Sequence, residues 1–571
     1  MEAGKRSIND LFNGNKILEI PFFQRSYVWD TPQWERFLSD MEHVSHINKP
    51  YFLGSVILKQ QLTNSMQSIG DKRTVIDGQQ RLTTLNIFFK VLSLKTGNTY
   101  LSSLFRLPMK NNEIALLHNH NDVAAFNKVL GLTAEVELPA EDNITKCYTF
   151  FSENLDVDKL NFQNILTNIM FVGIDLGVDE DEQQIFDTIN SLGVKLTTAE
   201  LLKNYFFGRD DIQLYRDYWL DVFEKNIETK DFWDTEIIAG RSRRYFIDLL
   251  FYSFLQIKIQ DNRFNVSADD KDEFSKLEGL FDSYKKFIKK YQINKLELIT
   301  EIREYAAVFR NNFDIEVVDY ELSAANSIER INAIIFGLEN TTLIPYVLFV
   351  LKNVQDPKEC NSILDYLEAY IMRRMVCHAN TKNYNQLFSE RLIGNNLITK
   401  EALKNYLEKQ SDKTNYMPSD AELKEGFHHS KLVNKQAAGI LYFIESKIRN
   451  RARHSTALLG LNRYSLEHIM PKKWENNWNG LVNDQDKINR NRKLLTLGNL
   501  TIITASLNSA IRDGNWDVKR SGKTNKPGLN HYAASLDTFS QYLPQPVWNE
   551  QKISERADFL YIKATEIWPV N

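Results

Sequence analysis

Two neighbouring residues in the last quarter of the chain, Glu467 and His468, are of types that hydrolytic sites use. They lie in the run YSLEHIMP, and Asn499 and Asn508 follow 31 and a further 9 residues later. Carboxylate and amide oxygens suit a hard cation such as Mg²⁺, and a histidine that titrates near neutrality can take a proton from water. The plainer alternative is a buried histidine with satisfied hydrogen bonds, accompanied by asparagines that only shape turns.

A second polar cluster lies in VIDGQQRLTTL, between a strand-like and a helix-like run, and comprises Asp77, Gly78, Gln79, Gln80 and Arg81. A glycine lets the backbone approach a ligand closely or adopt a positive φ, and the first turn of the following helix favours phosphate. The alternative is a capped helix in which the acid satisfies backbone amides and the arginine pairs with a surface carboxylate. This stretch alone does not decide between them.

The elements around the C-terminal cluster place it where strands end. Residues 465–470 and 499–504 are strand-like, and a helix is expected from about residue 505. Pro471 cannot continue a strand. The acid–histidine pair therefore sits at a strand end, where both side chains can reach one site.

With 571 residues, the chain is too long for a single core, and we expect a multidomain α+β protein. Residues 1–210 mix strand-like and helical patterns, which indicates an α/β domain. Residues 211–408 read as helical nearly throughout, and residues 409–571 as a C-terminal domain entered through a polar linker at 409–424. The clearest strand-like runs of the first domain are residues 51–58 and 169–176.

The charge is distributed unevenly along the chain. The net charge is −4, but residues 447–526 contain sixteen Lys and Arg against six Asp and Glu, a local charge of +10. Such a block suits a phosphate backbone, although a solvated surface of uneven composition is the alternative. The candidate contacts to DNA phosphates are Arg490, Arg492, Lys493, Lys519, Arg520, Lys523 and Lys526.

Several classes of protein are disfavoured by what the sequence lacks. No apolar run reaches the roughly 20 residues that cross a bilayer, and the first residues lack the apolar core of a signal peptide, so we expect a cytoplasmic protein. Cys147, Cys360 and Cys377 are scattered, which predicts neither disulfides nor a thiolate zinc site. A P-loop motif is absent, which excludes a conventional ATPase motor.

The C-terminal pattern resembles the ββα-metal nuclease fold (HNH, or His-Me finger), because EH-x-x-P, GNL and LN elements occur in that order. The resemblance implies that Glu467 and Asn508 bind Mg²⁺ or Mn²⁺ and that His468 is the general base. It also implies that Asn499 shapes the loop around the catalytic histidine. The cation would stabilise charge on the phosphate and on the leaving oxygen.

Three segments accompany the DGQQR cluster: IPFFQRSYVW at 20–29, FLGS at 52–55, and IFDTINSLGVKLTTAELLKNYFF at 185–207. Together they resemble the N-terminal domain of the GmrSD-type modification-dependent (type IV) restriction endonucleases. That family joins this domain, whose fold is similar to those of ParB and sulfiredoxin, to an HNH-like nuclease. With the C-terminal motifs, the resemblance covers most of the chain.

The resemblance implies that the N-terminal domain binds and hydrolyses an NTP, whose base stays open. Arg81 and Arg25 would contact the triphosphate, and Asp77 would hold a cation or orient water, assisted by the glutamines. The full set of nucleotide-site residues is Asp77, Gly78, Gln79, Gln80, Arg81, Gln24 and Arg25.

Neighbouring residues in the same segments carry weaker expectations. Phe22 and Phe23 could stack on bases or belong to the core. Tyr27 and Trp29 are expected in the core. The remaining expectations are a shaped turn at Asn190 and Gly193 and a helix cap at Thr197 and Thr198.

The leading hypothesis is an anti-phage DNA endonuclease that acts on modified phage DNA, with cleavage or nicking regulated by the nucleotide. One alternative is a nonspecific nuclease that causes abortive infection. Another is a ParB-like, nucleotide-dependent DNA-binding regulator that does not cleave. DNA and an NTP are the expected partners, no membrane is involved, and the oligomeric state stays open, a homodimer being one option.

Overall fold

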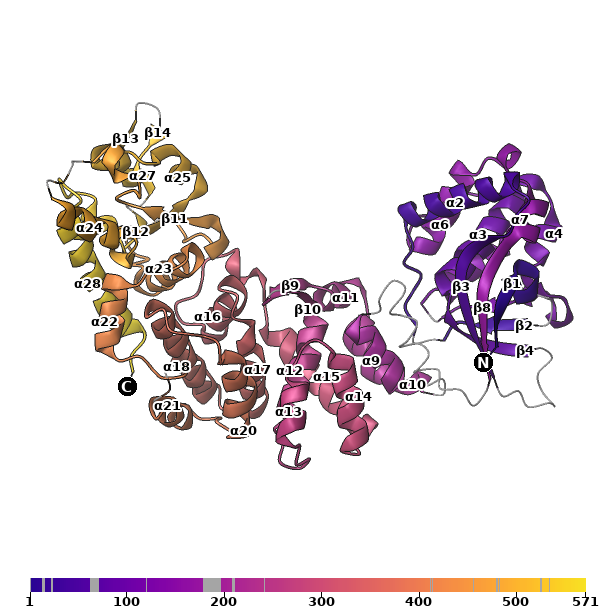
Figure 1. Ribbon diagram of the computed structural model, residues 1–571, viewed down its shortest axis with the longest axis horizontal. Coiled ribbons are helices and arrows are strands. Elements are labelled where there is room, and N and C mark those ends of the chain that lie inside the picture. Colours follow the sequence, from indigo (N-terminus) through magenta and orange to yellow (C-terminus); the bar gives the residue numbers. More distant parts are fainter. Residues whose placement is uncertain are drawn as a thin grey trace. The chain divides into compact units, whose positions relative to one another are not determined.

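The computed structural model describes residues 2–12, 16–21, 24–61, 71–119, 121–177, 197–207, 211–240, 242–410, 412, 414–454, 456–478, 481, 483–523, 526–532 and 535–570. The chain forms two compact units, Met1–Asp221 and Val222–Asn571. Figure 1 draws the first in indigo and purple and the second from magenta to yellow. The first boundary lies near the one expected at residue 210, whereas the helical segment and the C-terminal segment form one unit.

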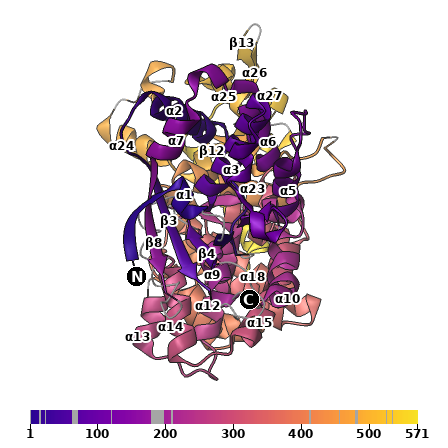
Figure 2. The same cartoon turned by 90° about the vertical axis from the view of Figure 1, so that its right-hand side faces the viewer.

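The first unit is built on a six-stranded mixed sheet with the order β1-β8-β3-β4-β2-β7. Its strands are β1 (Glu2–Ser7), β2 (Lys16–Glu19), β3 (Tyr51–Gln60), β4 (Asp71–Asp77), β7 (Leu116–Leu117) and β8 (Ile169–Leu176). Strand β3 runs parallel to β8 and antiparallel to β4, and Figure 2 shows these three strands next to one another. The two strand-like runs predicted from the sequence are therefore confirmed as β3 and β8.

Alternate residues of these strands face two different hydrophobic clusters, as the two-residue period of a strand requires. Val56, Leu58 and Val75 belong to the main core, whereas Ile57 and Ile76 belong to a smaller cluster on the other face. The helices that contribute to the main core are α1 (Ile8–Leu11), α2 (Thr31–His46), α3 (Gln79–Thr96), α4 (Thr99–Ser103), α5 (Val123–Gly131), α6 (Asn143–Asn154) and α7 (Phe162–Asn168).

The first part of the second unit is helical, as predicted, apart from one hairpin. The hairpin pairs β9 (Glu236–Ala239) with β10 (Ser242–Tyr245) in antiparallel register. The longer helices of this part of the second unit are α12 (Phe246–Ile259), α14 (Leu280–Lys290), α15 (Lys295–Asn312), α17 (Ile344–Asn353), α18 (Pro357–Val376) and α21 (Lys400–Glu408).

The segment expected as a linker, residues 409–424, is held against α18 by buried side chains. Arg374 is fully buried and donates to the main-chain oxygens of Thr414 and Tyr416, each at 2.7 Å. Arg373 donates to the main-chain oxygen of Pro418 at 2.9 Å. These hydrogen bonds tie the segment to the helices, which corrects the expectation of a linker between separate domains.

The C-terminal part contains the expected strand, strand and helix in that order. Strand β11 (Tyr464–His468) pairs antiparallel with β12 (Leu500–Thr504), and α25 (Ala505–Ile511) follows directly. The surrounding elements are α22 (Asp420–His429), α23 (Asn434–Ile448), α24 (Asp484–Lys493), α26 (Trp516–Ser521), β13 (Gly522–Lys523), β14 (Lys526–Pro527), α27 (Leu529–Tyr532) and α28 (Glu550–Ile567). Helix α28 packs against α22 and α23, as Figure 1 shows.

Two general features of the sequence can be compared with the fold. Across the part of the chain that the structure describes, no helix is both long and apolar enough to cross a membrane. The three cysteines are free thiols, of which Cys147 is buried.

One polar side chain of the first unit, that of His118, is almost completely buried. Its exposed fraction is 2%, and its Nε2 atom lies 2.8 Å from Oγ1 of Thr83 on α3. Burial lowers the pKa of this imidazole to about 4, from 6.5. The folded chain therefore holds His118 neutral over a pH range in which the unfolded chain protonates it.

This difference predicts that the first unit loses stability as the pH falls from about 6.5 to about 4, because the unfolded chain binds the proton first. The loss attributable to His118 is about 3 kcal/mol, at 1.36 kcal/mol per pKa unit. About 2 kcal/mol of this loss falls above pH 5.0, at 1.36 kcal/mol per pKa unit, and hydrogen exchange of α3 amides in urea, at pH 7.5 and pH 5.0, measures it. The His118→Gln variant should show a smaller difference between the two pH values, and an equal difference would contradict the prediction.

Candidate functional site

The first site residue, Glu467, lies inside the protein on β11, opposite Thr501 of β12. Its carboxylate forms an ion pair with the ammonium of Lys519 on α26. The same ammonium donates to the main-chain oxygen of His468 at 2.6 Å. Both partners lose hydration when they are buried. This loss raises the pKa of Glu467 and lowers the pKa of Lys519.

The adjacent His468 closes β11 and is half-buried. Burial lowers the pKa of its imidazole to about 4, and the nearby charges of Lys472 and Lys519 act in the same direction. The imidazole is therefore neutral at neutral pH, which is the form that can accept a proton.

The third residue, Asn499, is fully buried just before β12 and uses its whole side-chain amide in hydrogen bonds. Its Oδ1 atom accepts from the main-chain N–H of Met470 at 2.9 Å and from Nε1 of Trp548 at 3.0 Å. Its Nδ2 atom donates to the main-chain oxygens of Met470 and Leu494, both at 2.9 Å. Asn499 therefore fastens the chain that follows His468.

The fourth residue, Asn508, lies on α25 above the first strand. Its Nδ2 atom donates to the main-chain oxygen of Leu466 at 3.1 Å and to Oγ of Ser465 at 3.3 Å. These contacts fix α25 against β11 and direct the amide nitrogen toward the protein. The four residues expected from the sequence thus lie on, or directly next to, the three elements β11, β12 and α25.

The types of these residues can be compared with the needs of a divalent cation. Over the described ranges of the chain, no group of three or more His, Cys, Asp or Glu is placed to hold a metal. Among the four residues expected from the sequence, the oxygen donors available to a cation are the carboxylate of Glu467 and the amide of Asn508, types that suit Mg²⁺ or Mn²⁺ with several water ligands. The donors fit such an ion in type, although Lys519 shares the carboxylate.

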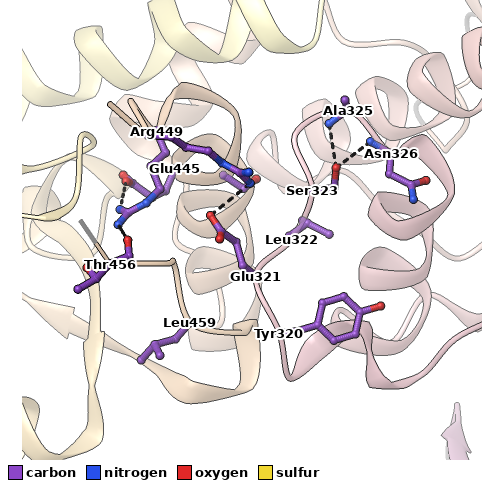
Figure 3. A network of polar contacts seen from close by, with 12 residues as sticks. Tyr320, Glu321, Leu322, Ser323, Ala325, Asn326, Glu445, Arg449, Thr456 and Leu459 are labelled. Carbon is purple, nitrogen blue, oxygen red and sulfur yellow. Dashed lines mark hydrogen bonds and ion pairs between the residues drawn. The ribbon is translucent and has the colours of Figure 1, made fainter. Parts of the chain in front are cut away.

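The helix behind the two strands is α23, which packs against both β11 and β12. Near its end, the buried carboxylate of Glu445 accepts from the main-chain N–H groups of Asp537 and Thr538, at 3.0 and 2.8 Å. Arg449 lies beside Glu445 and donates to the main-chain oxygen of Thr456 at 2.8 Å, as Figure 3 shows. This polar network ties α23 to the segments on either side of it.

The basic residues expected at the surface fall into two groups. Arg490 is buried, pairs with Glu550 at 2.5 Å and lies 4.6 Å from the ring centre of Trp474, while Lys519 is buried against Glu467. Neither is the exposed phosphate contact that the sequence suggested. Arg492, Lys523 and Lys526 are exposed, and Lys493 and Arg520 are partly buried.

The N-terminal site lies where β4 ends and α3 begins. Gly78, with a φ of +100°, forms the turn, and the carboxylate of Asp77 accepts from Oγ of Ser55 at 2.8 Å. Arg81 donates to the main-chain oxygen of Ser55 at 3.0 Å and lies 3.8 Å from Asp77. A Cβ atom on Gly54 would lie 2.6 Å from Nε of Arg81, so the glycine of the FLGS motif leaves room for this guanidinium.

Two glutamines of the predicted site hold the segment 24–29 in place. The buried Gln80 accepts from the main-chain N–H of Val28 at 2.9 Å and donates to the main-chain oxygen of Ser26 at 3.2 Å. Gln24 donates to the main-chain oxygen of Val75 at 2.8 Å. The amide of Gln80 is therefore engaged within the protein, where it positions the segment.

Three buried polar atoms near this turn lack a hydrogen-bond partner among the residues that the structure describes: Oε1 of Gln24, Nε of Arg25 and Oε1 of Gln79. Buried polar atoms are nearly always satisfied, so such groups point to a missing water or ligand. Tyr27 is confirmed as a core residue, and Thr197 as the cap of α9 (Thr198–Phe206). The expectations for Phe22, Phe23, Asn190 and Gly193 lie outside the described residues.

Sequence reasoning missed a second segment that shapes this site. Asn119 donates to the main-chain oxygens of Gln24 and Arg25, at 3.3 and 3.1 Å. The carboxylate of Asp122 accepts from the main-chain N–H of Tyr27 at 2.7 Å. The sequence signal was the run HNHND at 118–122. Five consecutive polar residues fit neither the helical nor the strand-like spacing of apolar residues, and this could have marked the run as part of a site.

Comparison with known families agrees with this two-site organisation. Residues 8–207 match the model of the GmrSD restriction endonuclease N-terminal domain, and residues 417–561 match that of the GmrSD restriction endonucleases C-terminal domain. A search of curated proteins found no match. The two matched segments contain both sites described above. The chain therefore belongs to the GmrSD family of restriction endonucleases.

Proposed function

We propose that this restriction-type nuclease cuts or nicks modified phage DNA in the cytoplasm through an HNH site formed by β11, β12 and α25. The observation that carries the proposal is the grouping of four residues on this unit. Glu467 and Asn508 supply oxygen donors, His468 supplies a neutral imidazole, and Asn499 fixes the loop after it. Each of these groups has a defined task in phosphodiester hydrolysis.

In this proposal, His468 takes a proton from the water that attacks the phosphate. Glu467 and Asn508 hold Mg²⁺ or Mn²⁺, which when bound neutralises charge on the phosphate and on the leaving oxygen. Lys519 forms an ion pair with Glu467. Its charge acts against the burial that raises the pKa of this carboxyl group.

We further propose that the first unit, as a ParB-like domain, binds and hydrolyses an NTP and thereby regulates cleavage. The N-terminal turn of α3 with Gly78 suits phosphate, and the guanidinium of Arg81 in the same turn would bind the phosphate oxygens. The unsatisfied polar atoms of Gln24, Arg25 and Gln79 support a ligand at this position. Asp77 would orient water or hold the cation of the nucleotide.

A second candidate is a nucleotide-dependent DNA-binding regulator without cleavage. The buried ion pair of Glu467 and Lys519 favours it, because the ammonium already neutralises the carboxylate. Cleavage assays on differently modified DNAs, with and without each NTP, separate the candidates. Equal cutting of unmodified DNA would indicate a nonspecific, abortive-infection nuclease, and tight binding without cutting would indicate a regulator.

The His468→Ala variant should lose at least a hundredfold in cleavage rate, the usual effect of removing a general base. Its affinity for DNA should stay unchanged, because the imidazole is not a phosphate anchor in this proposal. Nicking of supercoiled DNA and a filter-binding assay measure the two quantities. The exposed His429→Ala is the matched control, and equal rates for both variants would refute the assignment.

The Asp77→Asn variant should reduce NTP hydrolysis at least tenfold, while the amide keeps the hydrogen bond from Ser55. Phosphate release from each of the four NTPs measures the change and also identifies the base. Asp158→Asn, at an exposed position of the same unit, should behave as the unchanged chain. Hydrolysis that survives in Asp77→Asn would remove this residue from the site.

The hairpin of β13 and β14 places Lys523 opposite Lys526, both exposed. If both contact DNA phosphates, the Lys523→Ala/Lys526→Ala variant should flatten the slope of log K against log salt by about 2. The pair Lys276→Ala/Lys289→Ala, in the helical segment, is the control. A slope that changes equally in both double variants would place the DNA elsewhere.

A further inference from the structure

The loop that carries Asn499 receives a fully buried arginine from the last helix. Arg556 of α28 has no exposed surface, and its Nη1 atom donates to three main-chain oxygens. These belong to Leu497 at 3.2 Å, Gly498 at 3.0 Å and Leu500 at 2.6 Å. One side chain thus holds the main chain on both sides of Asn499.

The surroundings of this guanidinium make it costly to bury. Burial lowers the pKa of Arg556 to about 10, from 12.5, and within the described part of the chain no carboxylate accepts a hydrogen bond from it. Its Nε atom donates to the main-chain oxygen of Thr538 at 3.1 Å, and Glu445 accepts from the N–H of the same residue. The charge of Glu445 acts to raise the pKa of Arg556, with no hydrogen bond between the two side chains in the described residues, and both side chains contact the main chain of Thr538.

The loop also packs closely against α28. If the hydrogen bonds of Arg556 are lost, the backbone of the loop therefore has no room to move toward α28 and compensate. A Cβ atom on Gly498 would lie 2.2 Å from the main-chain oxygen of Ile553. From the loop, two hydrogen bonds lead to the residues after His468. The main-chain oxygen of Asn499 accepts from Ile469 at 2.9 Å, and its Oδ1 atom accepts from Met470 at 2.9 Å.

We infer that Arg556 is a positioning residue of the nuclease site, which sets the place of His468 through the loop 497–500 and Asn499; this rests on the proposed HNH function. The guanidinium does not contact the reacting groups. Its hydrogen bonds fix three carbonyls on the side of the loop where no described strand pairs with it, and Asn499 transmits this geometry to the end of β11. A displacement of about 1 Å at a reacting group costs up to a hundredfold in rate.

The same chain offers a matched control in Arg374 of α18. Its side chain is also fully buried, and it also donates to three main-chain oxygens, those of Tyr416, Asn380 and Thr414, at 2.6 to 2.7 Å. It holds the segment near residue 415 rather than the catalytic loop. Arg→Lys at either position keeps the charge but removes the planar set of donors.

Arg556→Lys and Arg374→Lys are therefore compared in the full chain with Mg²⁺. Arg556→Lys should lower kcat for DNA cleavage at least tenfold and leave KM within about twofold, since DNA contacts are not changed. Arg374→Lys should leave kcat within about twofold. Hydrogen exchange, measured without metal, should rise in Arg556→Lys at the amides of Ile469 and Met470 and in the loop 497–500, and in Arg374→Lys near residue 415.

Unchanged exchange after Arg556→Lys, or an equal fall of kcat in both variants, would overturn the inference and leave Arg556 a general stabiliser. If the unchanged chain cuts no DNA, the proposed function fails, and the exchange data still decide whether Arg556 holds the loop. Gly498→Ala, which pushes the same loop away from α28, should raise exchange at the same amides and lower kcat in the same way. A Gly498→Ala variant with full kcat would contradict the inference as well.

Discussion

The second unit depends on buried arginine side chains that use their N–H groups on main-chain oxygens. Arg374 holds the segment between the helical part and α22, and Arg556 holds the loop before β12. Apart from Leu500, which begins β12, the residues whose carbonyl groups these arginines bind lie outside the strands that the structure describes, and an unsatisfied buried carbonyl costs about 1–3 kcal/mol. A guanidinium has five donors in one plane, so a single side chain can order several residues of irregular chain. This explains why two parts that we expected as separate domains form one compact unit.

In the first unit, uncharged amide side chains perform the equivalent task. Gln80, Gln24 and Asn119 each donate to main-chain oxygens and hold the segment 24–29 at the end of β4. A neutral amide can be buried at a lower cost than a cation. The two sites are thus supported by different kinds of side chain.

The sequence predicted those features that depend on local pattern. The strands β3, β8 and β11 followed from short strand-like runs in the sequence. Contacts between distant residues were not predictable in this way. The pairing of Glu467 with Lys519 and the burial of Arg490 depend on how helices pack. The sequence of a basic segment does not show which of its Lys and Arg side chains are buried.

The support of the loop 497–500 comes from residues that are synthesised late. His468 and β12 precede Trp548 and Arg556, the side chains that fasten Asn499 and the loop around it. A growing chain on the ribosome therefore contains His468 before it contains the side chains that fix the residues after it. The first unit and the helical segment are already synthesised when α28 emerges. The order of synthesis thus delays the final packing of the loop 497–500 until almost the whole chain has been made.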